Sequence, residues 1–190
     1  NDNGTLKYVG TCECGHIVSE EVEEKEVEVS NEADLRNVLA SGHNAKLVAD
    51  IDLALTIEVT NTVAVDLNGH TLTARNEPQG LGIFKVQTGG NLTINGEGKL
   101  DSCGNNAYSI AVWARGGKVT INGGTYTNVG AHSENDSEHF DLIYVSAGGE
   151  IVINGGTFIN ETPKWTLNHH NGTQGKIVVN GGKFYNFDPS

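Results

Sequence analysis

The sequence predicts an all-β fold, namely a single-stranded right-handed parallel β-helix of about six coils with a capping α-helix at its N-terminal end. Two observations lead to this prediction. A tripeptide of the form apolar-Asn-Gly recurs along the chain, and the composition combines 25 glycines with only 3 prolines. Such a composition suits many tight turns between short strands better than it suits helices.

The tripeptide recurs with an almost constant period. Its five copies are Leu67-Asn68-Gly69, Ile94-Asn95-Gly96, Ile121-Asn122-Gly123, Ile153-Asn154-Gly155 and Val179-Asn180-Gly181. Successive asparagines lie 27, 27, 32 and 26 residues apart. Coils stacked at about 4.8 Å keep equivalent residues in register, whereas a sandwich of hairpins would not keep so strict a period. The period therefore favours a stack of coils.

Each repeat contains three short runs of alternating residues, as in Ser109–Trp113, Lys118–Ile121 and Thr125–Thr127. Alternation of this kind is typical of half-buried strands, so we expect three strands in each coil. The inward residues should form three columns. These are Val65, Leu92, Val119, Ile151 and Ile177; Leu67, Ile94, Ile121, Ile153 and Val179; and Leu72, Leu100, Tyr126, Phe158 and Phe184.

The repeated asparagines are interpreted as structural. Each should lie at a bend where the following glycine supplies a positive φ, and stacked side-chain amides can hydrogen-bond from coil to coil. The sequence therefore predicts an asparagine ladder of Asn68, Asn95, Asn122, Asn154 and Asn180.

The chain divides into an N-terminal acidic arm, residues 1–29, and a β-helix with its cap, residues 30–190. Ser30–Ser41 places Leu35, Val38 and Leu39 on one helical face, and such a helix would cover the open N-terminal end of the stack. The arm carries a run of glutamates, which either docks on a partner through its charge or forms a solvated edge.

The formal charge of −12 argues against a nucleic acid or an anionic membrane as partner, because like charges repel. No stretch has the roughly 18 apolar residues of a membrane-spanning helix. The segment Cys12-Glu13-Cys14-Gly15-His16 lacks the usual Cys-x2-Cys spacing of a structural zinc site. We therefore expect no cofactor and no structural zinc here, and interpret these cysteines as free thiols or an intersubunit bridge.

The segments "VDLNGHTLT", "VTINGGTYTN", "IVINGGTFIN" and "GGKFYNFDPS" resemble the repeats of pectin-lyase-like parallel β-helix proteins over about residues 46 to 188. The closest likeness is to short non-catalytic members among bacteriophage virion proteins and bacterial surface adhesins. This resemblance implies a homotrimer on a virion surface, as a decoration, head-fibre or tail protein. It also implies attachment to a capsid or tail, for which residues 1–30 are the candidate anchor, or alternatively an extracellular, cell-surface location.

The resemblance also raises the question whether the chain is an enzyme. Lyases of this fold use a calcium-binding aspartate cluster with a basic residue, yet here the arginines are only Arg36, Arg75 and Arg115, and no two carboxylates recur in one column. We therefore expect no basic residue in the sheet columns and no enzyme activity. The alternative is a polysaccharide-degrading lyase or glycosidase, the latter using carboxylates from Asp101, Asp136, Glu138 and Asp141.

Two segments are candidate binding sites for a glycan or a metal ion. The longest insertion, Asn128–Phe140, and the residue after it contribute His132, Glu134, Asp136, Glu138, His139 and Asp141. Thr162–Thr173 contributes Trp165, His169 and His170, and an exposed Trp can cover the apolar face of a sugar. Each has a plainer interpretation: a solvated polar loop for the first, and core or trimer-seam positions for Trp165 and Trp113. A non-enzymatic structural or glycan-binding module is the function that we expect.

Overall fold

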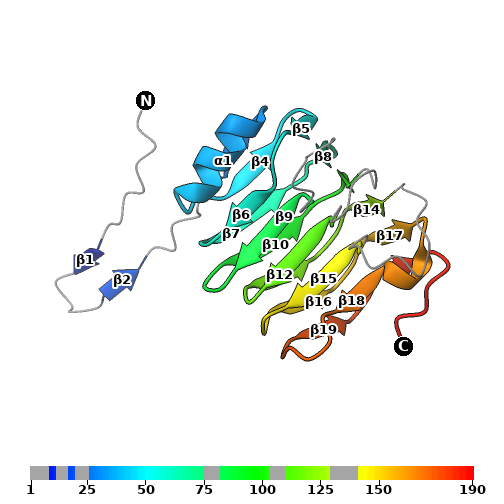
Figure 1. The fold of residues 1–190 in the computed structure, drawn as a ribbon. Coiled ribbons are helices and arrows are strands. Elements are labelled where there is room, and N and C mark those ends of the chain that lie inside the picture. Colours follow the sequence, from blue (N-terminus) through cyan, green and yellow to red (C-terminus); the bar gives the residue numbers. More distant parts are fainter. Residues whose placement is uncertain (1–8, 12–16, 20–25, 75–81, 103–109, 129–140) are drawn as a thin grey trace.

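The structure is a computed structural model, and it describes residues 9–11, 17–19, 26–74, 82–102, 110–128 and 141–190 (Figure 1). Most of the described elements are strands. The helical elements are α1 (Glu32–Ala40) and a short 3-10 turn, η1 (Pro163–Trp165). A small antiparallel pair joins β1 (Val9–Thr11) to β2 (Ile17–Ser19), and the other described strands form three parallel sheets.

The three parallel sheets, here called sheets I, II and III, have the following strands. Sheet I contains β3 (Val27–Val29), β4 (Ala45–Leu47), β7 (Thr62–Asp66), β10 (Asn91–Asn95), β13 (Lys118–Ile121), β16 (Glu150–Ile153) and β19 (Lys176–Val179). Sheet II contains β5 (Ile51–Leu53), β8 (Thr71–Ala74), β11 (Lys99–Asp101), β14 (Thr125–Asn128), β17 (Thr157–Asn160) and β20 (Lys183–Phe184). Sheet III contains β6 (Ile57–Val59), β9 (Phe84–Gln87), β12 (Val112–Arg115), β15 (Ile143–Ser146) and β18 (Leu167–His169).

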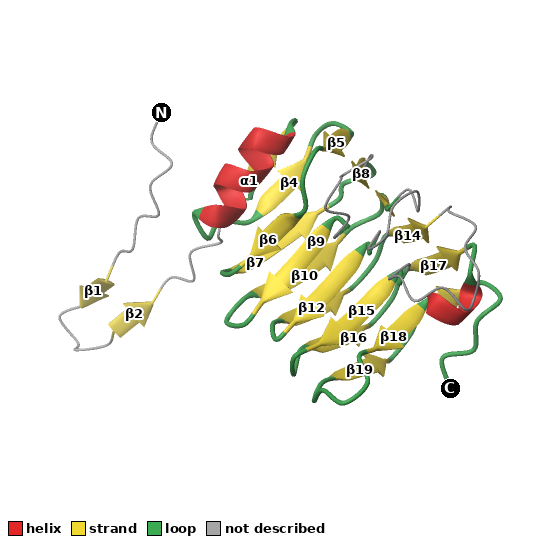
Figure 2. Cartoon of the chain, in the orientation of Figure 1, coloured by secondary structure: helices red, strands yellow, loops and turns green. Residues whose placement is uncertain are grey.

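The chain enters the sheets in the order I, II, III and repeats this order from β4–β5–β6 to β16–β17–β18, ending with β19–β20 (Figure 2). Equivalent strands of successive repeats are hydrogen-bonded neighbours, as β10 is to β13 and β11 is to β14. A mostly β protein with three parallel sheets in this order is compatible with the predicted parallel β-helix.

The core lies between the sheets because alternate residues of each strand turn inward. Tyr126, Phe158 and Phe184 stack from coil to coil with ring centroids 4.9 Å and 4.7 Å apart, as their predicted column requires. Tyr126 and Phe158 are completely buried. Burial of such rings stabilises the stack together with the buried aliphatic residues.

The first members of the two sheet I columns were predicted wrongly. Strand pairing places Val63 beside Leu92 and Val65 beside Ile94, whereas the prediction placed Val65 beside Leu92 and Leu67 beside Ile94. The cause is the length of the first turn. Four residues separate Asp66 from Thr71, whereas two separate Asn122 from Thr125, so the first Leu-Asn-Gly lies two residues further along its coil.

The asparagine ladder contains four members. Asn122, Asn154 and Asn180 each donate Nδ2 to the Oδ1 of the preceding member, Asn95, Asn122 and Asn154, at 2.8, 2.9 and 2.9 Å. Stacked amides thus join successive coils outside the core, at the end of each sheet I strand.

Asn68 is not part of the ladder, which corrects the prediction. Asp66 occupies the equivalent position opposite Asn95, and Asn68 donates instead to the carbonyl oxygen of Leu47 at 2.9 Å. Asn68 itself adopts a φ of 46°. The tripeptide Leu67-Asn68-Gly69 thus matches the later copies in sequence but lies in a longer turn. Asn suits this turn because it tolerates the left-handed region better than most residues.

The glycines after the ladder have two different roles. A Cβ on Gly155 would lie 2.8 Å from the carbonyl oxygen of Asn122, so close stacking of coils excludes a side chain there. The positive φ, 109°, belongs to the next residue, Gly156. The expectation that the residue directly after the asparagine supplies the positive φ holds for Gly96, with a φ of 79°, but not for this Gly-Gly turn.

The predicted capping helix is present. It was expected over Ser30–Ser41 and spans Glu32–Ala40, with Asn31 as N-cap accepting from the backbone N–H of Asp34 at 2.9 Å. Leu35 and Leu39 are buried, and α1 contacts β3, β4, β5 and β6, the first strands of all three sheets (Figure 1). The helix therefore covers the N-terminal end of the core.

The predicted boundary between arm and core lies too late in the chain. Val27–Val29 forms β3, which pairs in parallel with β4, and Val29 is 1% exposed. These residues were assigned to the acidic arm but belong to sheet I. The short run Val-Glu-Val carries no copy of the repeat, so only pairing with β4 reveals its role.

Candidate binding face

The outer surface of sheet III carries an unusual set of side chains. On β9, β12 and β15 the inward residues are apolar and fully buried, as Phe84 and Val86 illustrate. The alternate positions face outward, and the strand register aligns Lys85, Trp113 and Tyr144 in one row across the sheet. A cation, an indole and a phenol thus lie side by side, of which Trp113 is partly exposed while Lys85 and Tyr144 are 7% and 3% exposed.

Trp113 is half-buried and is held by two side chains of β15. Its Nε1 donates to Ser146 Oγ at 2.8 Å, and its ring centroid lies 5.6 Å from that of Tyr144 with the rings inclined by 47°. Ser146 lies one strand away, on β15. Because the indole N–H is already satisfied, the ring offers mainly its flat face to a ligand.

Two cations flank the Trp113 ring. Lys85 Nζ lies 5.2 Å and the Arg115 guanidinium carbon 5.8 Å from its centroid, both within cation–π range. Lys85 also donates to Glu58 Oε1 at 3.0 Å, and this hydrogen bond holds the pKa of Glu58 below its usual value. Lys85 is 7% exposed, while Arg115 is exposed and remains accessible as a donor.

Tyr144 connects this row to the next coil. Its hydroxyl lies 2.8 Å from His170 Nδ1, and the two rings meet edge to face. Burial and the nearby negative charge of Asp141 raise the pKa of Tyr144 to about 12. Asp141 is fully buried and accepts from Asn168 Nδ2 at 2.8 Å. We call Lys85, Trp113, Arg115, Tyr144 and His170 the aromatic platform.

The predicted site residues are brought together only in part. His132, Glu134, Asp136, Glu138 and His139 lie outside the described residues. Asp141 and His170 both come close to Tyr144, so one residue from each candidate segment lies beside this ring.

His169 and Trp165 lie elsewhere. The register of β18 places His169 beside the inward Val145, and His169 is half-buried, so it is not part of the row formed by Trp113 and Tyr144. Trp165 ends η1, is half-buried, and has Lys164 Nζ 5.1 Å from its ring centroid. Its Nε1 is buried and has no hydrogen-bond partner in the part of the chain that is described.

Sequence reasoning missed Lys85, Arg115, Tyr144 and Ser146. The expectation that no basic residue lies in the sheet columns is wrong, because Lys85 and Arg115 occupy outward positions on neighbouring strands of sheet III. Strict alternation within the runs around Phe84 and Ile143 would have identified the outward positions. It could not have shown that they are aligned, since that depends on the lengths of the intervening turns.

Asp101, the remaining catalytic candidate among the described residues, is not part of the aromatic platform. Asp101 lies on sheet II with Lys99 Nζ 2.7 Å from its Oδ2, and Asp136, Glu138 and the Cys12–His16 segment lie outside the described residues. Within the described ranges, no three His, Cys, Asp or Glu residues are grouped to hold a metal ion. Among those same ranges, no helix is long and apolar enough to cross a membrane.

Comparison with protein-family models found no match, and searches of curated proteins and of solved structures also found none.

Proposed function

We propose that the three sheets are the faces of one right-handed parallel β-helix and that the chain is a non-enzymatic binding module of the pectin-lyase-like type. The repeated strand order and the coil-to-coil asparagine ladder support the fold. The repeated residues form the core columns and the asparagine ladder, so the repeat itself has a structural role. The outer face of sheet III, which the repeat does not require to be aromatic, is where a binding function resides.

The ligand that fits the aromatic platform is a glycan. An aromatic face packs on the apolar side of a pyranose ring, and surrounding donors bind its hydroxyls. Trp113 provides the face, while Arg115 beside its ring and His170 beside Tyr144 are exposed polar groups. The pairing of Trp113 with Tyr144, fixed by the hydrogen bond to Ser146, is the observation that carries this proposal.

The setting of the module follows from the sequence resemblance. It is a virion surface, where the chain is a decoration, head-fibre or tail component attached through residues 1–30, or alternatively a bacterial cell surface where the chain is an adhesin. The position of α1 supports this attachment, because α1 and β3 lie at the end of the stack opposite β19 (Figure 1). The homotrimer remains a prediction.

A panel of immobilised neutral and acidic glycans, probed with the full chain, tests the binding function. The best glycan is then titrated against wild type, Trp113→Ala and Trp165→Ala. Loss of the Trp113 face should weaken binding by at least about tenfold, the usual effect of removing a central aromatic contact. Trp165→Ala removes the same side chain away from the aromatic platform and should bind as wild type does.

Two results would contradict the proposal. One is the absence of binding to any glycan of the panel at millimolar concentration. The other is equal loss of affinity in both tryptophan variants, with both chains folded by circular dichroism, which would place the ligand elsewhere.

A further inference from the structure

The repeat contains a chemically reactive dipeptide. In Asn-Gly the backbone attacks the asparagine side chain more easily than elsewhere, because glycine has no Cβ to block the approach of its nitrogen. The sequence contains seven such dipeptides, and six of them lie among the described residues. These six begin at Asn68, Asn95, Asn122, Asn154, Asn171 and Asn180. The stability of the repeat over time therefore depends on how each asparagine is held.

The reaction is an internal cyclisation that needs no enzyme. The backbone nitrogen of the glycine bonds to Cγ of the asparagine, and the side-chain nitrogen leaves as ammonia with the proton that the glycine N–H gives up. Water then opens the succinimide ring by breaking one of its two C–N bonds. The product is aspartate, or isoaspartate if the bond at the main-chain carbonyl breaks. The reaction requires a side chain that can rotate and a glycine N–H that is not hydrogen-bonded.

The asparagine ladder fixes the side chains of Asn122 and Asn154. Each donates Nδ2 to the preceding asparagine and accepts at Oδ1 from the following one, at 2.8 to 2.9 Å. Rotation of either side chain toward its glycine would break two hydrogen bonds. The glycines cannot shift either, since a Cβ on Gly123 or Gly155 would lie 2.7 or 2.8 Å from a carbonyl oxygen of the preceding coil. The ladder therefore protects these two dipeptides.

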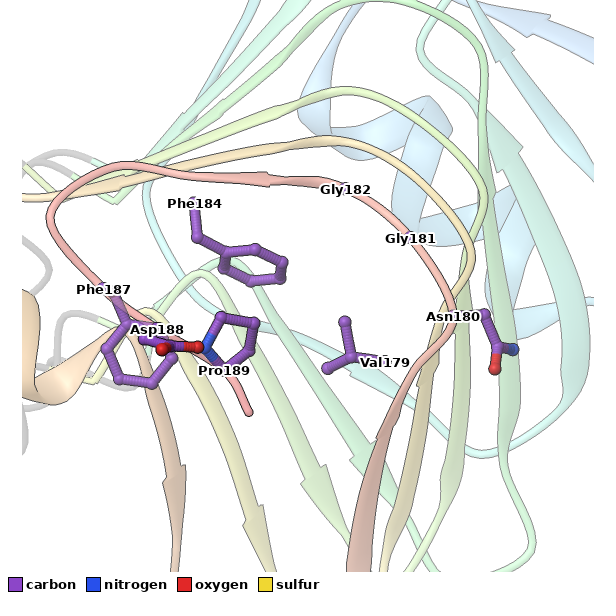
Figure 3. Close-up of a pocket in the computed structure, with 8 residues that line it drawn as sticks. All are labelled: Val179, Asn180, Gly181, Gly182, Phe184, Phe187, Asp188 and Pro189. Carbon is purple, nitrogen blue, oxygen red and sulfur yellow. The ribbon is translucent and has the colours of Figure 1, made fainter.

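Exposure to water does not by itself make an asparagine of this chain reactive. Asn180 is exposed, and Figure 3 shows its side chain directed away from the space that Phe184 enters. Its Nδ2 nevertheless donates to Asn154 at 2.9 Å, and the N–H of Gly181 donates to the carbonyl oxygen of Ile153 at 3.3 Å. Both reacting groups of this dipeptide are held although the asparagine faces solvent.

Two dipeptides nearer the N-terminal end are held in other ways. Asn68 donates Nδ2 to the carbonyl oxygen of Leu47 at 2.9 Å, and the N–H of Gly69 donates to the carbonyl oxygen of Glu97. Asn95, the first member of the ladder, accepts at Oδ1 from the second member at 2.8 Å. Each of these asparagines must break at least one hydrogen bond before its ring can close.

Asn171-Gly172 differs from the other five. It lies in the turn between β18 and β19, both residues are exposed, and a Cβ on Gly172 would meet nothing within 4 Å beyond its chain neighbours. Among the described residues, neither the side chain of Asn171 nor the N–H of Gly172 has a hydrogen-bond partner. The turn is closed by Thr173, whose N–H donates to the carbonyl oxygen of His170 at 3.3 Å. Both reacting groups are therefore available.

We propose that Asn171 is the site at which the folded chain deamidates, while hydrogen bonds protect the other five described dipeptides. The product introduces a carboxylate one residue from His170, whose Nδ1 lies 2.8 Å from the hydroxyl of Tyr144. Isoaspartate also lengthens the backbone of this turn by one carbon atom. The modification therefore alters charge and backbone beside a member of the aromatic platform. It does not depend on glycan binding.

Peptide mapping by mass spectrometry tests the proposal on the full chain, incubated at mildly alkaline pH for increasing times. Asn171 should convert to aspartate and isoaspartate at least about tenfold faster than any asparagine of the ladder, because the ladder must first open locally. In urea all of the Asn-Gly dipeptides should convert at comparable rates. Asn171→Gln is the matched control, since its longer side chain would have to form a six-membered ring, and the folded variant should stay unmodified.

Asn154→Ala tests the protective role of the ladder. It removes the acceptor of Asn180 and the donor to Asn122, so deamidation of Asn180 in the folded chain should become faster, while the rate at Asn171 stays the same. Circular dichroism establishes that the variant is folded. An Asn171 that stays unmodified in folded wild type, or ladder asparagines that convert there as fast as Asn171, would overturn the proposal. An unchanged rate at Asn180 in the folded variant would show that the ladder gives no protection.

Discussion

Trp113, Lys85 and Tyr144 occupy one outward row, yet they share neither size nor charge. The inward residues on either side of them, such as Val112 and Ala114, are uniformly apolar and fully buried. Inward residues are constrained because a close-packed core tolerates neither charge nor changes of volume. Outward residues are not part of this close-packed core, so their size and charge can differ from strand to strand.

The inward position of Ile121 predicts a large effect of charge. Ile121→Asp places a carboxylate at a fully buried position next to Ile94 and Ile153, and we expect the chain not to fold. Thr120→Asp, one residue away and partly exposed, should cost less than about 1 kcal/mol. Soluble expression and thermal unfolding compare the two. Similar damage from both changes would mean that the inward and outward positions are misassigned.

The raised pKa of Tyr144 predicts how stability depends on alkaline pH. An unfolded tyrosine ionises near pH 10, whereas Tyr144 in the fold ionises at about 12. The favourable term is therefore complete below pH 10 and is lost as the pH rises through 12, because the unfolded chain releases its proton first.

The thermal midpoint of wild type should consequently fall more steeply between pH 10 and about 12 than that of Tyr144→Phe, which has no proton to release. Parallel curves for the two proteins would show that Tyr144 is not held neutral by its surroundings.

The core columns from Leu92 and Ile94 onward could be predicted residue by residue because alternation and the Gly-rich turns are local signals. The position of Asn68 could not be predicted, because Leu67-Asn68-Gly69 has the same sequence pattern as the later copies. It differs from them only in the register of its coil against β10. The aromatic platform was missed for the same reason. Trp113 and Tyr144 are neighbours because β12 pairs with β15. The register of that pair depends on how the connecting chain folds, and no local sequence pattern indicates this.

At the scale of elements, α1 is fastened to the first coil by a pair of charged side chains. Glu32 accepts from the backbone N–H of Ala54 at 2.8 Å, and Arg36 Nε donates to Glu32 at 2.9 Å while Nη1 donates to the carbonyl of Thr56 at 3.0 Å. Burial alone would raise the pKa of Glu32, but these hydrogen bonds outweigh it and lower the pKa. The amphipathic pattern predicts the helix but does not reveal this attachment.

Glu32→Gln should destabilise the protein at pH 7 by roughly 1.5–3 kcal/mol, the range for hydrogen bonds to a charged group. A lowered pKa means that the stabilisation is present above the usual carboxyl pKa and is lost as the pH falls through the folded value. The difference between wild type and variant in urea unfolding should therefore shrink at pH 3. A difference independent of pH would show that the charge of Glu32 contributes nothing.

At the scale of the whole molecule, the position of β3 defines how much of the N-terminal arm the core needs. A chain lacking residues 1–25 keeps β3 and its buried Val29, so its thermal midpoint should equal that of the full chain. A chain beginning at Ser30 loses this strand and should melt lower. If both truncations were equally stable, β3 would not belong to the core; if removal of 1–25 were destabilising, the arm would not be a separate extension.

The proposed glycan-binding function requires that Trp113 contacts the ligand. The chain contains only two tryptophans, so Trp165→Phe leaves Trp113 as the only indole. Fluorescence of this variant should change saturably when the glycan selected by the panel is added, with the same dissociation constant as binding measured by calorimetry. Binding by calorimetry with no change in Trp113 emission would contradict the account.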